Sequence, residues 1–307
     1  MKIAVLGAGA MGSIYGGKLA EDGHEVALID VWGEHVEQIN SKGLRLDGLG
    51  GDRRLKIKAC LLPAEIGPVE LVIVLVKATM TREAMAGATC LVGPGTMVLT
   101  LQNGLGNIES LVSVVGEGKV IAGISSHGAN VKGPGWVCHA GGGATCLGEL
   151  DGRITDRLKN LGRVFDQSGF HPVVLSDNVM SLIWKKLIIN VAINAITTLA
   201  RIRNGQILDF QETEEIARLA ILEAVEVAGR KGIVFRDDPL KFTLDVIRQT
   251  GANRSSMLQD VTRQRRTEIE VINGAIVREG EALGVSVPVN KVLTGLVSVY
   301  QQTYPKD

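Results

Sequence analysis

The sequence predicts an α/β protein in which an N-terminal domain built on a parallel sheet is followed by an all-α C-terminal domain. In the first half, short apolar runs alternate with helical patterns, and a glycine-rich turn follows the first run. In the second half only helical periodicity remains. At 307 residues the chain exceeds the size of most single hydrophobic cores, so we divide it into domains 1–176 and 177–307.

Near-continuous apolar runs in the first domain predict parallel strands that are buried on both faces of one sheet. These runs are KIAVL (2–6), EVALID (25–30), LVIVLV (71–76), TMVLTL (96–101) and KVIAGIS (119–125). From 124 to 149 the pattern changes to short β-type runs broken by Gly-Pro-Gly and by three successive glycines. This pattern is typical of antiparallel strands joined by tight turns, which we expect to extend one edge of the sheet.

The second domain is expected to be nearly all helical, because apolar residues recur there at helical spacing. The amphipathic segments are 178–200, 211–232, 238–249 and 256–284. Neither an internal repeat nor a low-complexity linker separates the two halves. We therefore expect the domains to be joined directly, with ligands bound in the cleft between them.

Charge and hydropathy exclude some classes of protein. Lys plus Arg and Asp plus Glu both number 33, so the net charge is zero, and this argues against a nucleic-acid-binding factor. Hydrophobic residues make up 45% of the chain and the mean hydropathy is +0.19. These values favour an apolar surface that a second copy of the chain covers, in a homodimer.

The cysteines and the apolar runs indicate the compartment. No CxxC pattern is present, so we expect neither a disulfide framework nor a metal site, as in a reducing compartment. No uninterrupted apolar run approaches the roughly 18 residues that a membrane span needs. We therefore expect a soluble, cytoplasmic protein without a membrane partner. The cysteines are Cys60, Cys90, Cys138 and Cys146.

The turn GAGAMG lies directly between the first predicted strand and a helical stretch. Gly7 permits the tight turn, Gly9 lets a pyrophosphate approach the backbone, and Gly12 lets the helix pack closely on the strand. A glycine-rich surface turn is the alternative, but strand, helix and a downstream acidic residue agree with a Rossmann βαβ unit that binds a nicotinamide dinucleotide. The expected contact set is Gly7, Ala8, Gly9, Ala10, Met11 and Gly12.

The acidic residue is Asp30, at the end of the second predicted strand. A carboxylate there accepts hydrogen bonds from the adenosine ribose and repels a 2′-phosphate, which favours NAD over NADP. A solvated Asp at a strand end is the alternative. Neither Val31 nor Trp32 offers a positive charge for NADP. Three residues elsewhere could supply one, namely Lys77, Arg53 and Arg54.

The apolar segment WKKLIINVAINAITTLA, which begins at residue 184, carries three polar residues on one helical face. Lys186, Asn190 and Asn194 drift by only about 80° in total at about 100° per residue. Buried without partners they would cost several kcal/mol, so they either face a wet cleft or form a polar seam against the first domain. A second polar group lies on and just before a later helix, where a solvated face is the default interpretation: Ser255, Ser256, Asp260, Arg263, Glu268 and Asn273.

Taken together, these residues resemble the ketopantoate reductase (2-dehydropantoate 2-reductase) family over essentially the whole chain. The resemblance implies an oxidoreductase that reduces 2-dehydropantoate to (R)-pantoate with NADPH, in pantothenate biosynthesis. Several motifs in order over both domains are more specific than the glycine turn alone. The matching elements are MKIAVLGAGAMG, LVKA with Lys77, QNGLGN with Asn103, SSHGA, WKKLIINVAIN, RNG with Asn204, NRSSMLQD and TEIEVING.

The resemblance also implies roles for individual residues. Lys186 is expected to be the general acid, with Glu268 also in the catalytic set. Asn103 and Glu268 should lie where cofactor and substrate meet, while Lys77 and Ala129 should line the cofactor cleft. Substrate contacts are expected from Asn103, Lys186, Asn190, Asn194, Asn204, Asn253 and Ser256.

These residue types suit the reduction of a 2-oxoacid. A hydride attacks the ketone carbon, and the oxygen that becomes an alkoxide needs a proton and a positive field, both of which a lysine supplies. Asparagines hydrogen-bond hydroxyl and carboxylate oxygens without adding charge.

One departure from the family leaves alternatives open. Asp30-Val31-Trp32 stands where members that use NADPH usually have a basic residue, so the resemblance favours NADP and Asp30 favours NAD. An NAD-dependent D-2-hydroxyacid dehydrogenase of the mandelate type is therefore an alternative, although Asn253 and Ser256 favour ketopantoate. The alternative from another class is a non-catalytic dinucleotide-binding regulator, but such a sensor needs no proton donor like Lys186.

Overall fold

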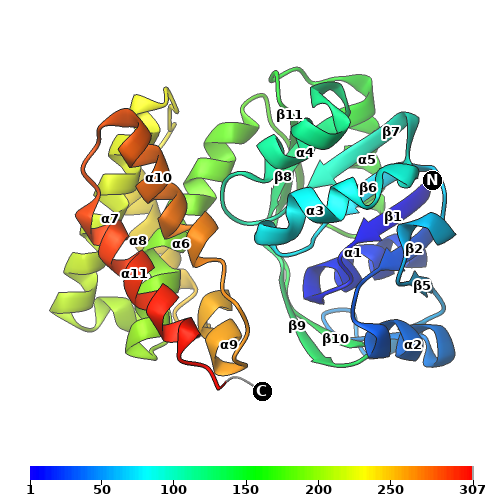
Figure 1. The fold of residues 1–307 in the computed structure, drawn as a ribbon, viewed down its shortest axis with the longest axis horizontal. Helices are drawn as coiled ribbons and strands as arrows, with labels where there is room; N and C mark the ends of the chain where they lie inside the picture. The colour runs from blue at the N-terminus through cyan, green and yellow to red at the C-terminus, as the bar shows by residue number, and fades with distance from the viewer. Residues whose placement is uncertain (306–307) are drawn as a thin grey trace. The chain divides into compact units, whose positions relative to one another are not determined.

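A computed structural model describes residues 1–305 of the chain (Figure 1). It divides into two compact units. The first unit comprises Met1–Gln102 and Asn107–Val179, and the second comprises Asn103–Gly106 and the residues from Met180 onward. The first unit is α/β and the second is helical, so the predicted fold class is confirmed.

The larger sheet of the first unit contains all five strands that the apolar runs predict. Strands β2, β1, β6, β7 and β8 are parallel neighbours in that order, with β5 added beside β2. At the other edge β11 pairs antiparallel with β8 and parallel with β12. The bounds are β1 Lys2–Leu6, β2 Glu25–Ile29, β5 Lys58–Cys60, β6 Val69–Val74, β7 Val92–Thr100, β8 Val120–Ser125, β11 Thr145–Glu149 and β12 Val173–Leu175.

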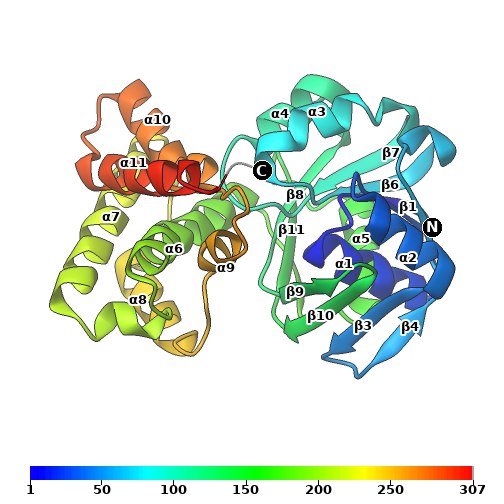
Figure 2. The same ribbon diagram turned by 60° about the horizontal axis from the view of Figure 1, so that its bottom comes forward.

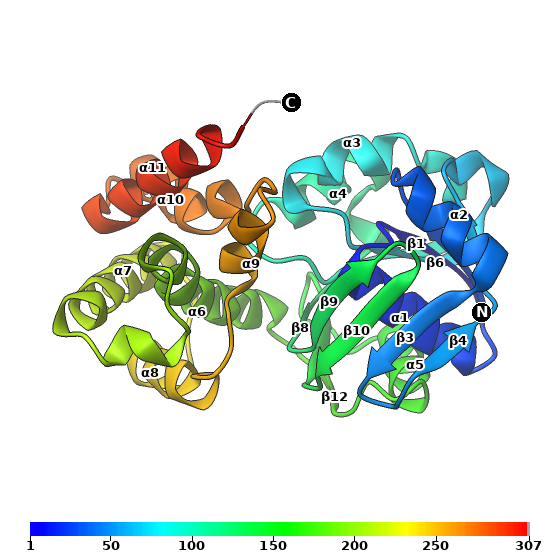
Figure 3. The ribbon, with the colours of Figure 1, turned by 90° about the horizontal axis from the view of Figure 1, so that it is seen from below.

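The prediction that residues 124–149 extend the edge of the larger sheet is correct only in part, because two of their strands belong to a smaller sheet. Only β11 extends the edge of the larger sheet, whereas β9 (Gly128–Gly133) and β10 (Trp136–Gly141) leave it and form an antiparallel pair elsewhere. β10 pairs parallel with β3 (Leu44–Gly48), which pairs with β4 (Arg53–Leu55), as Figure 3 shows. The sequence pattern does not predict β3, β4 or β5, because short strands with mixed polarity obtain their partners from distant segments.

Helix α1 (Ala10–Glu21) packs between the larger and the smaller sheet. Adjacent glycines make this possible. A Cβ at Gly16 would lie 2.4 Å from Leu28 of the larger sheet, and one at Gly17 would lie 2.6 Å from Leu46 of the smaller sheet. The helix that follows the glycine turn is therefore held on both sides.

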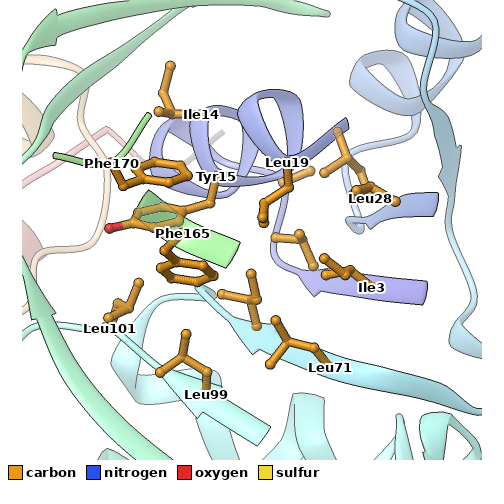
Figure 4. Packing of buried hydrophobic residues seen from close by; sticks show 14 of the residues in the cluster. Ile3, Ile14, Tyr15, Leu19, Leu28, Leu71, Leu99, Leu101, Phe165 and Phe170 are labelled. Carbon is orange, nitrogen blue, oxygen red and sulfur yellow. The ribbon is translucent and has the colours of Figure 1, made fainter. Parts of the chain in front are cut away.

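Aromatic packing fixes α1 further (Figure 4). Tyr15 is fully buried, and its ring stacks on Phe170 with ring centroids 4.2 Å apart. Its hydroxyl shares a hydrogen bond of 2.8 Å with Thr145 at the start of β11. Burial raises the pKa of Tyr15 to about 12, so it stays a neutral core residue.

The opposite face of the larger sheet carries α3 (Thr81–Ala86) and α4 (Asn107–Val115), which lie side by side in Figure 2. Alternate residues of β1 serve the two faces: Ile3 belongs to the core on the α1 side and Ala4 to the core on the other. The expectation of a sheet buried on both faces is confirmed. The first unit is completed by α2 (Gly33–Lys42) and α5 (Asp156–Gln167).

The second unit is built around α6 (Val179–Ala200), whose apolar residues from Trp184 to Ile196 join the core. The remaining helices are α7 Gln211–Arg230, α8 Pro239–Gln249, α9 Ser256–Thr262, α10 Asn273–Leu283 and α11 Pro288–Gln302. The prediction of one helical segment over 256–284 is wrong. The chain leaves the helix after α9, where Gln264 has a φ of 53°, and passes through the short helix η6 (Ile269–Val271) before α10 begins.

Among residues 1–305, α6 is the one helix long and apolar enough to cross a membrane by length and composition. Its most apolar window has a mean hydropathy of 1.5, and 56% of that window is buried inside the structure. Core helices of globular proteins meet the same criterion, so the feature is weak evidence for a span.

Candidate functional site

The three glycines of the turn differ in what an added Cβ would meet. Gly7 has a φ of +97°, and a Cβ there would lie 2.6 Å from the backbone nitrogen of Val76. A Cβ at Gly12 would lie 1.9 Å from the carbonyl oxygen of Gly7, so strand and helix could not approach as they do. At Gly9 no atom of the described residues lies within 4 Å of the Cβ position, and the residue is exposed. The turn therefore leaves its backbone open at the position where a pyrophosphate would approach.

The N-terminus of α1 suits an anion. Gly9 is the N-cap, no side chain of the described residues caps it, and no acidic residue lies in the first turn, which Ala10 and Met11 open. The orphan N–H groups and the helix dipole are thus directed at whatever lies above Gly9. The Ser13 hydroxyl donates a 2.7 Å hydrogen bond to the buried carbonyl of Ala8, which ties the turn to the helix. These residues fit the pyrophosphate of a dinucleotide.

Asp30 follows β2 directly and is half-buried. Its backbone N–H donates to the Cys60 carbonyl at 3.2 Å, and its Oδ1 accepts the backbone N–H of Trp32 at 3.0 Å. Within residues 1–305, Oδ2 accepts no hydrogen bond, so it is available to a ribose hydroxyl. Glu34 in the first turn of α2 adds a second negative charge nearby in the sequence.

Two of the three cationic side chains considered for a 2′-phosphate, Arg53 and Arg54, donate hydrogen bonds within the first unit. The Arg53 guanidinium pairs with Glu21 through Nε and Nη2, and its Nη1 donates to backbone carbonyls, including that of Gly51 at 3.0 Å. Arg54 donates to the Lys42 carbonyl at 3.3 Å. The third, Lys77, is exposed at the N-cap of the short helix η2 (Ala78–Met80).

Ala129, the other residue expected beside the cofactor, lies on β9 opposite His139 of β10. It is half-buried and packs against the core of the first unit. Its methyl group offers apolar contact and no charge.

In the second unit, α6 carries the expected polar face. Lys186 and Asn190 are half-buried, whereas Asn194 is only 3% exposed. The Nδ2 of Asn194 is buried and makes no hydrogen bond within the described part of the chain. A buried amide donor of this kind is costly in a purely structural position, so it marks Asn194 as a candidate ligand contact.

Asn103 and Glu268 are brought together although 165 positions separate them. Asn103 Nδ2 donates to Glu268 Oε2 at 3.4 Å, which is a long hydrogen bond. Backbone contacts hold the two segments. Leu105 N–H donates to the Val271 carbonyl at 3.0 Å, and a Cβ on Gly104 would lie 2.4 Å from that same oxygen. This docking explains why residues 103–106 belong to the second unit.

The remaining substrate candidates lie on two neighbouring segments. The Asn204 N–H donates to the Asn253 carbonyl at 3.0 Å, and Asn204 Nδ2 donates to Thr250 Oγ1 at 3.1 Å. Asn253 and Ser256 have exposed side chains. Ser256 opens α9, but the N-cap is Ser255, whose hydroxyl accepts the Leu258 N–H.

Within residues 1–305, no group of three or more His, Cys, Asp or Glu side chains could hold a metal ion. One residue near the dinucleotide turn is not predicted from the sequence: His35, which is fully buried on α2. Its signal was weak, because a lone histidine beside apolar residues is typical of an ordinary core position.

Comparisons with known proteins cover both units of the chain. Residues 3–152 match the family model "Ketopantoate reductase PanE/ApbA", and residues 178–301 match "Ketopantoate reductase PanE/ApbA C terminal". The 2-dehydropantoate 2-reductase of Pyrococcus abyssi is 37% identical over 297 residues, covering 97% of each protein.

Two solved structures are similar over nearly the whole chain. A PanE/ApbA family ketopantoate reductase from Ralstonia eutropha has a TM-score of 0.92 at 35% identity, covering 98% of this chain and 99% of that one. A ternary complex of D-mandelate dehydrogenase with NADH and anilino(oxo)acetate has a TM-score of 0.93 at 30% identity, covering 99% of each chain. With matches of this identity and extent, the resemblance seen in the motifs is confirmed, and the chain belongs to the ketopantoate reductase family.

Proposed function

We propose that this chain reduces 2-dehydropantoate to (R)-pantoate with a reduced nicotinamide dinucleotide. The chain is an oxidoreductase by family membership. The observation that carries the choice of chemistry is the row of Lys186, Asn190 and Asn194 along one face of α6. A lysine in such a row supplies both a proton and a positive charge to a developing alkoxide.

When bound, the reduced dinucleotide supplies a hydride to the ketone carbon of the substrate. The Lys186 ammonium donates a proton to the ketone oxygen, so one hydride and one proton convert C=O to CH–OH. Its charge also stabilises that oxygen as negative charge develops. The buried Nδ2 of Asn194 and the amide of Asn190 hydrogen-bond the substrate's oxygen atoms without adding a charge.

Further contacts are proposed from the residues around this row. Asn204, Asn253 and Ser256 contact the substrate, with Ser256 at its carboxylate end. Asn103 contacts cofactor and substrate, and Glu268, which accepts the amide hydrogen bond of Asn103, completes the catalytic set. These roles are those that the family resemblance implies for the matching positions.

A comparison of substrates tests this function directly. Steady-state kcat/KM values should be measured for 2-dehydropantoate, benzoylformate and branched 2-oxoacids at saturating cofactor. We expect 2-dehydropantoate to give the highest value. A higher value for benzoylformate would refute the proposal and favour a D-2-hydroxyacid dehydrogenase of the mandelate type. That second candidate is supported by the similarity to D-mandelate dehydrogenase and by the acidic strand end at Asp30.

For the cofactor, we propose that NADH serves at least as well as NADPH. Asp30 offers an oxygen to a ribose hydroxyl, whereas the Arg53 guanidinium is held by Glu21. Titration of both reduced cofactors under one set of conditions tests the proposal. A strong preference for NADPH would show that the Asp30 carboxylate does not contact the ribose.

We also propose a homodimer formed through α7 and α11. These packed helices expose apolar side chains toward solvent and border an apolar hollow of about 390 Å³, which includes Leu296 and Ile216. Sedimentation equilibrium should give twice the chain mass, and Leu296→Glu should give a monomer. The exposed apolar residues on the two helices are Ile216, Leu219, Leu222, Val292, Leu296 and Val299.

The proposed setting is the cytoplasm, in pantothenate biosynthesis and without nucleic acid or membrane as a partner. Within residues 1–305 the cysteines form no disulfide, which suits a reducing compartment. Complementation of a bacterial strain that lacks its own ketopantoate reductase tests the biosynthetic role. Growth without added pantothenate is expected, and dependence on pantothenate would contradict it. The alternative of a non-catalytic regulator is disfavoured, since a regulator would not need the Lys186 row.

A further inference from the structure

His35, in the first turn of α2, links three segments of the first unit. It is fully buried, and its Nδ1 accepts the N–H of Gly135 at 3.0 Å, in the turn between β9 and β10. Because Nδ1 is an acceptor, the neutral ring carries its proton on Nε2. That atom is buried and makes no hydrogen bond of standard geometry within residues 1–305.

The same ring faces the end of β2. The rings of His35 and Trp32 are stacked, with centroids 4.9 Å apart and an interplanar angle of 14°. The Trp32 backbone N–H in turn donates to the Asp30 carboxylate. Burial lowers the pKa of His35 below 6.5, while the Asp30 charge and the backbone of Ala8 act in the opposite direction. His35 thus lies against the glycine turn, the acidic strand end and the β9–β10 turn together.

His35 has a structural role that a phenylalanine would fill only in part. A phenylalanine would keep the ring stacking on Trp32 but would leave the buried Gly135 N–H without the acceptor that Nδ1 provides. The half-buried Trp32 and its 95% exposed neighbour Val31 directly follow Asp30 in the chain, so two apolar side chains adjoin the acidic strand end in the sequence. An apolar, partly aromatic surface next to a ribose-binding carboxylate suits a purine base.

We propose that Trp32 is a specificity-determining contact for the adenosine half of the dinucleotide, and that His35 is the positioning residue that holds Trp32 in place. The Trp32 side chain provides an aromatic surface for the adenine, while Asp30 accepts from the ribose. The Asp30 carboxylate would repel a 2′-phosphate here, and the Arg53 guanidinium is already held by Glu21. The inference rests on the proposed dinucleotide use, and it does not depend on which 2-oxoacid is reduced.

Calorimetric titration with ADP-ribose tests the inference, because this probe has no nicotinamide and needs no turnover. We expect Trp32→Ala to weaken ADP-ribose binding about tenfold, as the loss of one aromatic contact does. The KM for NADH should rise by a similar factor, while the KM for the 2-oxoacid and kcat at saturating NADH stay within about twofold. Unchanged ADP-ribose affinity in Trp32→Ala would overturn the proposal.

Two substitutions at His35 separate the stacking of its ring on Trp32 from the hydrogen bond that it accepts from Gly135. His35→Phe keeps a ring against Trp32, so we expect it to retain most of the ADP-ribose affinity even if it lowers Tm. His35→Asn keeps an acceptor for Gly135 but removes the ring, so its affinity should fall nearly as far as that of Trp32→Ala. Adding His35→Asn to Trp32→Ala should then cause little further loss. Additive losses would show that His35 does not act through Trp32.

Failure of this inference is distinguishable from failure of the proposed function. If the wild-type chain binds ADP-ribose and Trp32→Ala weakens that binding, the inference holds even when 2-dehydropantoate is a poor substrate. If 2-dehydropantoate is reduced efficiently and Trp32→Ala leaves ADP-ribose binding unchanged, the inference fails while the function stands.

Discussion

The glycine turn of the first unit and the polar face of α6 in the second unit are proposed to bind their ligands by opposite means. At Gly7, Gly9 and Gly12 the absence of side chains matters, because added Cβ atoms would strike the backbone or fill the open surface. Along α6 the side chains themselves matter, since in the proposed reaction Lys186 supplies the proton and the asparagines supply the hydrogen bonds. A site made of backbone should therefore be destroyed by adding atoms, and a site made of side chains by removing them.

The largest expected effect is on turnover, from Lys186→Ala. Loss of the proton donor should lower kcat by about 10²- to 10⁴-fold, while dinucleotide affinity stays nearly constant. Lys185→Ala is the matched control. The Lys185 ammonium pairs with Asp237 at 2.8 Å and lies over the Phe242 ring, so its removal should leave kcat within about twofold. Equal loss of activity in both variants would refute a specific role for Lys186.

Next in size is a matched pair in the turn. Gly12→Ala places a Cβ 1.9 Å from the Gly7 carbonyl oxygen, so it should destabilise the fold by at least about 1–3 kcal/mol or prevent folding. Gly9→Ala meets no atom within 4 Å, so Tm should hardly change. Its methyl group would nevertheless occupy the surface above the α1 N-terminus, and NADH affinity should fall about tenfold or more. Thermal unfolding and NADH titration separate the two outcomes, and tight NADH binding by Gly9→Ala would contradict this view of the turn.

A smaller effect distinguishes adjacent serines in the second unit. Ser255 caps α9 and shares a 2.7 Å hydrogen bond with Thr197, so Ser255→Ala should cost about 1–2 kcal/mol of stability. Ser256 is exposed and caps nothing, so Ser256→Ala should leave Tm unchanged and raise the KM for the 2-oxoacid. If Ser256→Ala lowers Tm and leaves KM alone, the side chain is structural.

The smallest effect concerns pH and a buried imidazole pair in the first unit. His127 Nδ1 lies 3.1 Å from His139 Nε2. Burial, followed by the charges of His139 and Lys18, lowers the pKa of His127 from 6.5 to about 4. The unfolded chain therefore binds more protons than the folded chain between these values, so stability present above pH 6.5 is lost as the pH falls toward 4.

The pKa of His139 is lowered as well, chiefly by burial and by Lys18, so both rings act in the same direction. Tm should fall by a few degrees between pH 7.5 and 5. His127→Gln should reduce this fall, because the group with the large shift is gone. An identical pH dependence in the variant would show that His127 does not titrate as described.

The sequence predicts elements that depend on neighbouring residues, such as the glycine turn, better than elements that depend on distant parts of the chain. The glycine turn and the strands beside it follow from local sterics and periodicity, so Gly7 and β1 could be predicted from a few neighbouring residues. The smaller sheet could not, because β10 takes β3 as its partner across a long stretch of chain. The end of the helix after α9 could not be predicted, because the apolar residues keep their helical spacing in the sequence although the backbone leaves the helical conformation at Gln264.

The candidate substrate site in the second unit is likewise predicted only where its residues are close in the sequence. The spacing of Lys186, Asn190 and Asn194 predicts a shared helical face, but it does not indicate which of them is buried. The juxtaposition of Asn103 with Glu268 depends on the docking of Leu105 onto Val271 and has no local signal. His35 was overlooked because its contacts come from Gly135 and Trp32, of which only Trp32 is near it in the sequence.

The central claim is that the turn binds the dinucleotide through its backbone while Lys186 performs the proton transfer. NADH dissociation constants and kcat with 2-dehydropantoate, measured side by side for Gly9→Ala and Lys186→Ala, test it most directly. We expect the NADH dissociation constant to rise only in Gly9→Ala, and kcat at saturating NADH to collapse only in Lys186→Ala. Weakened NADH binding in Lys186→Ala together with unchanged binding in Gly9→Ala would contradict the claim.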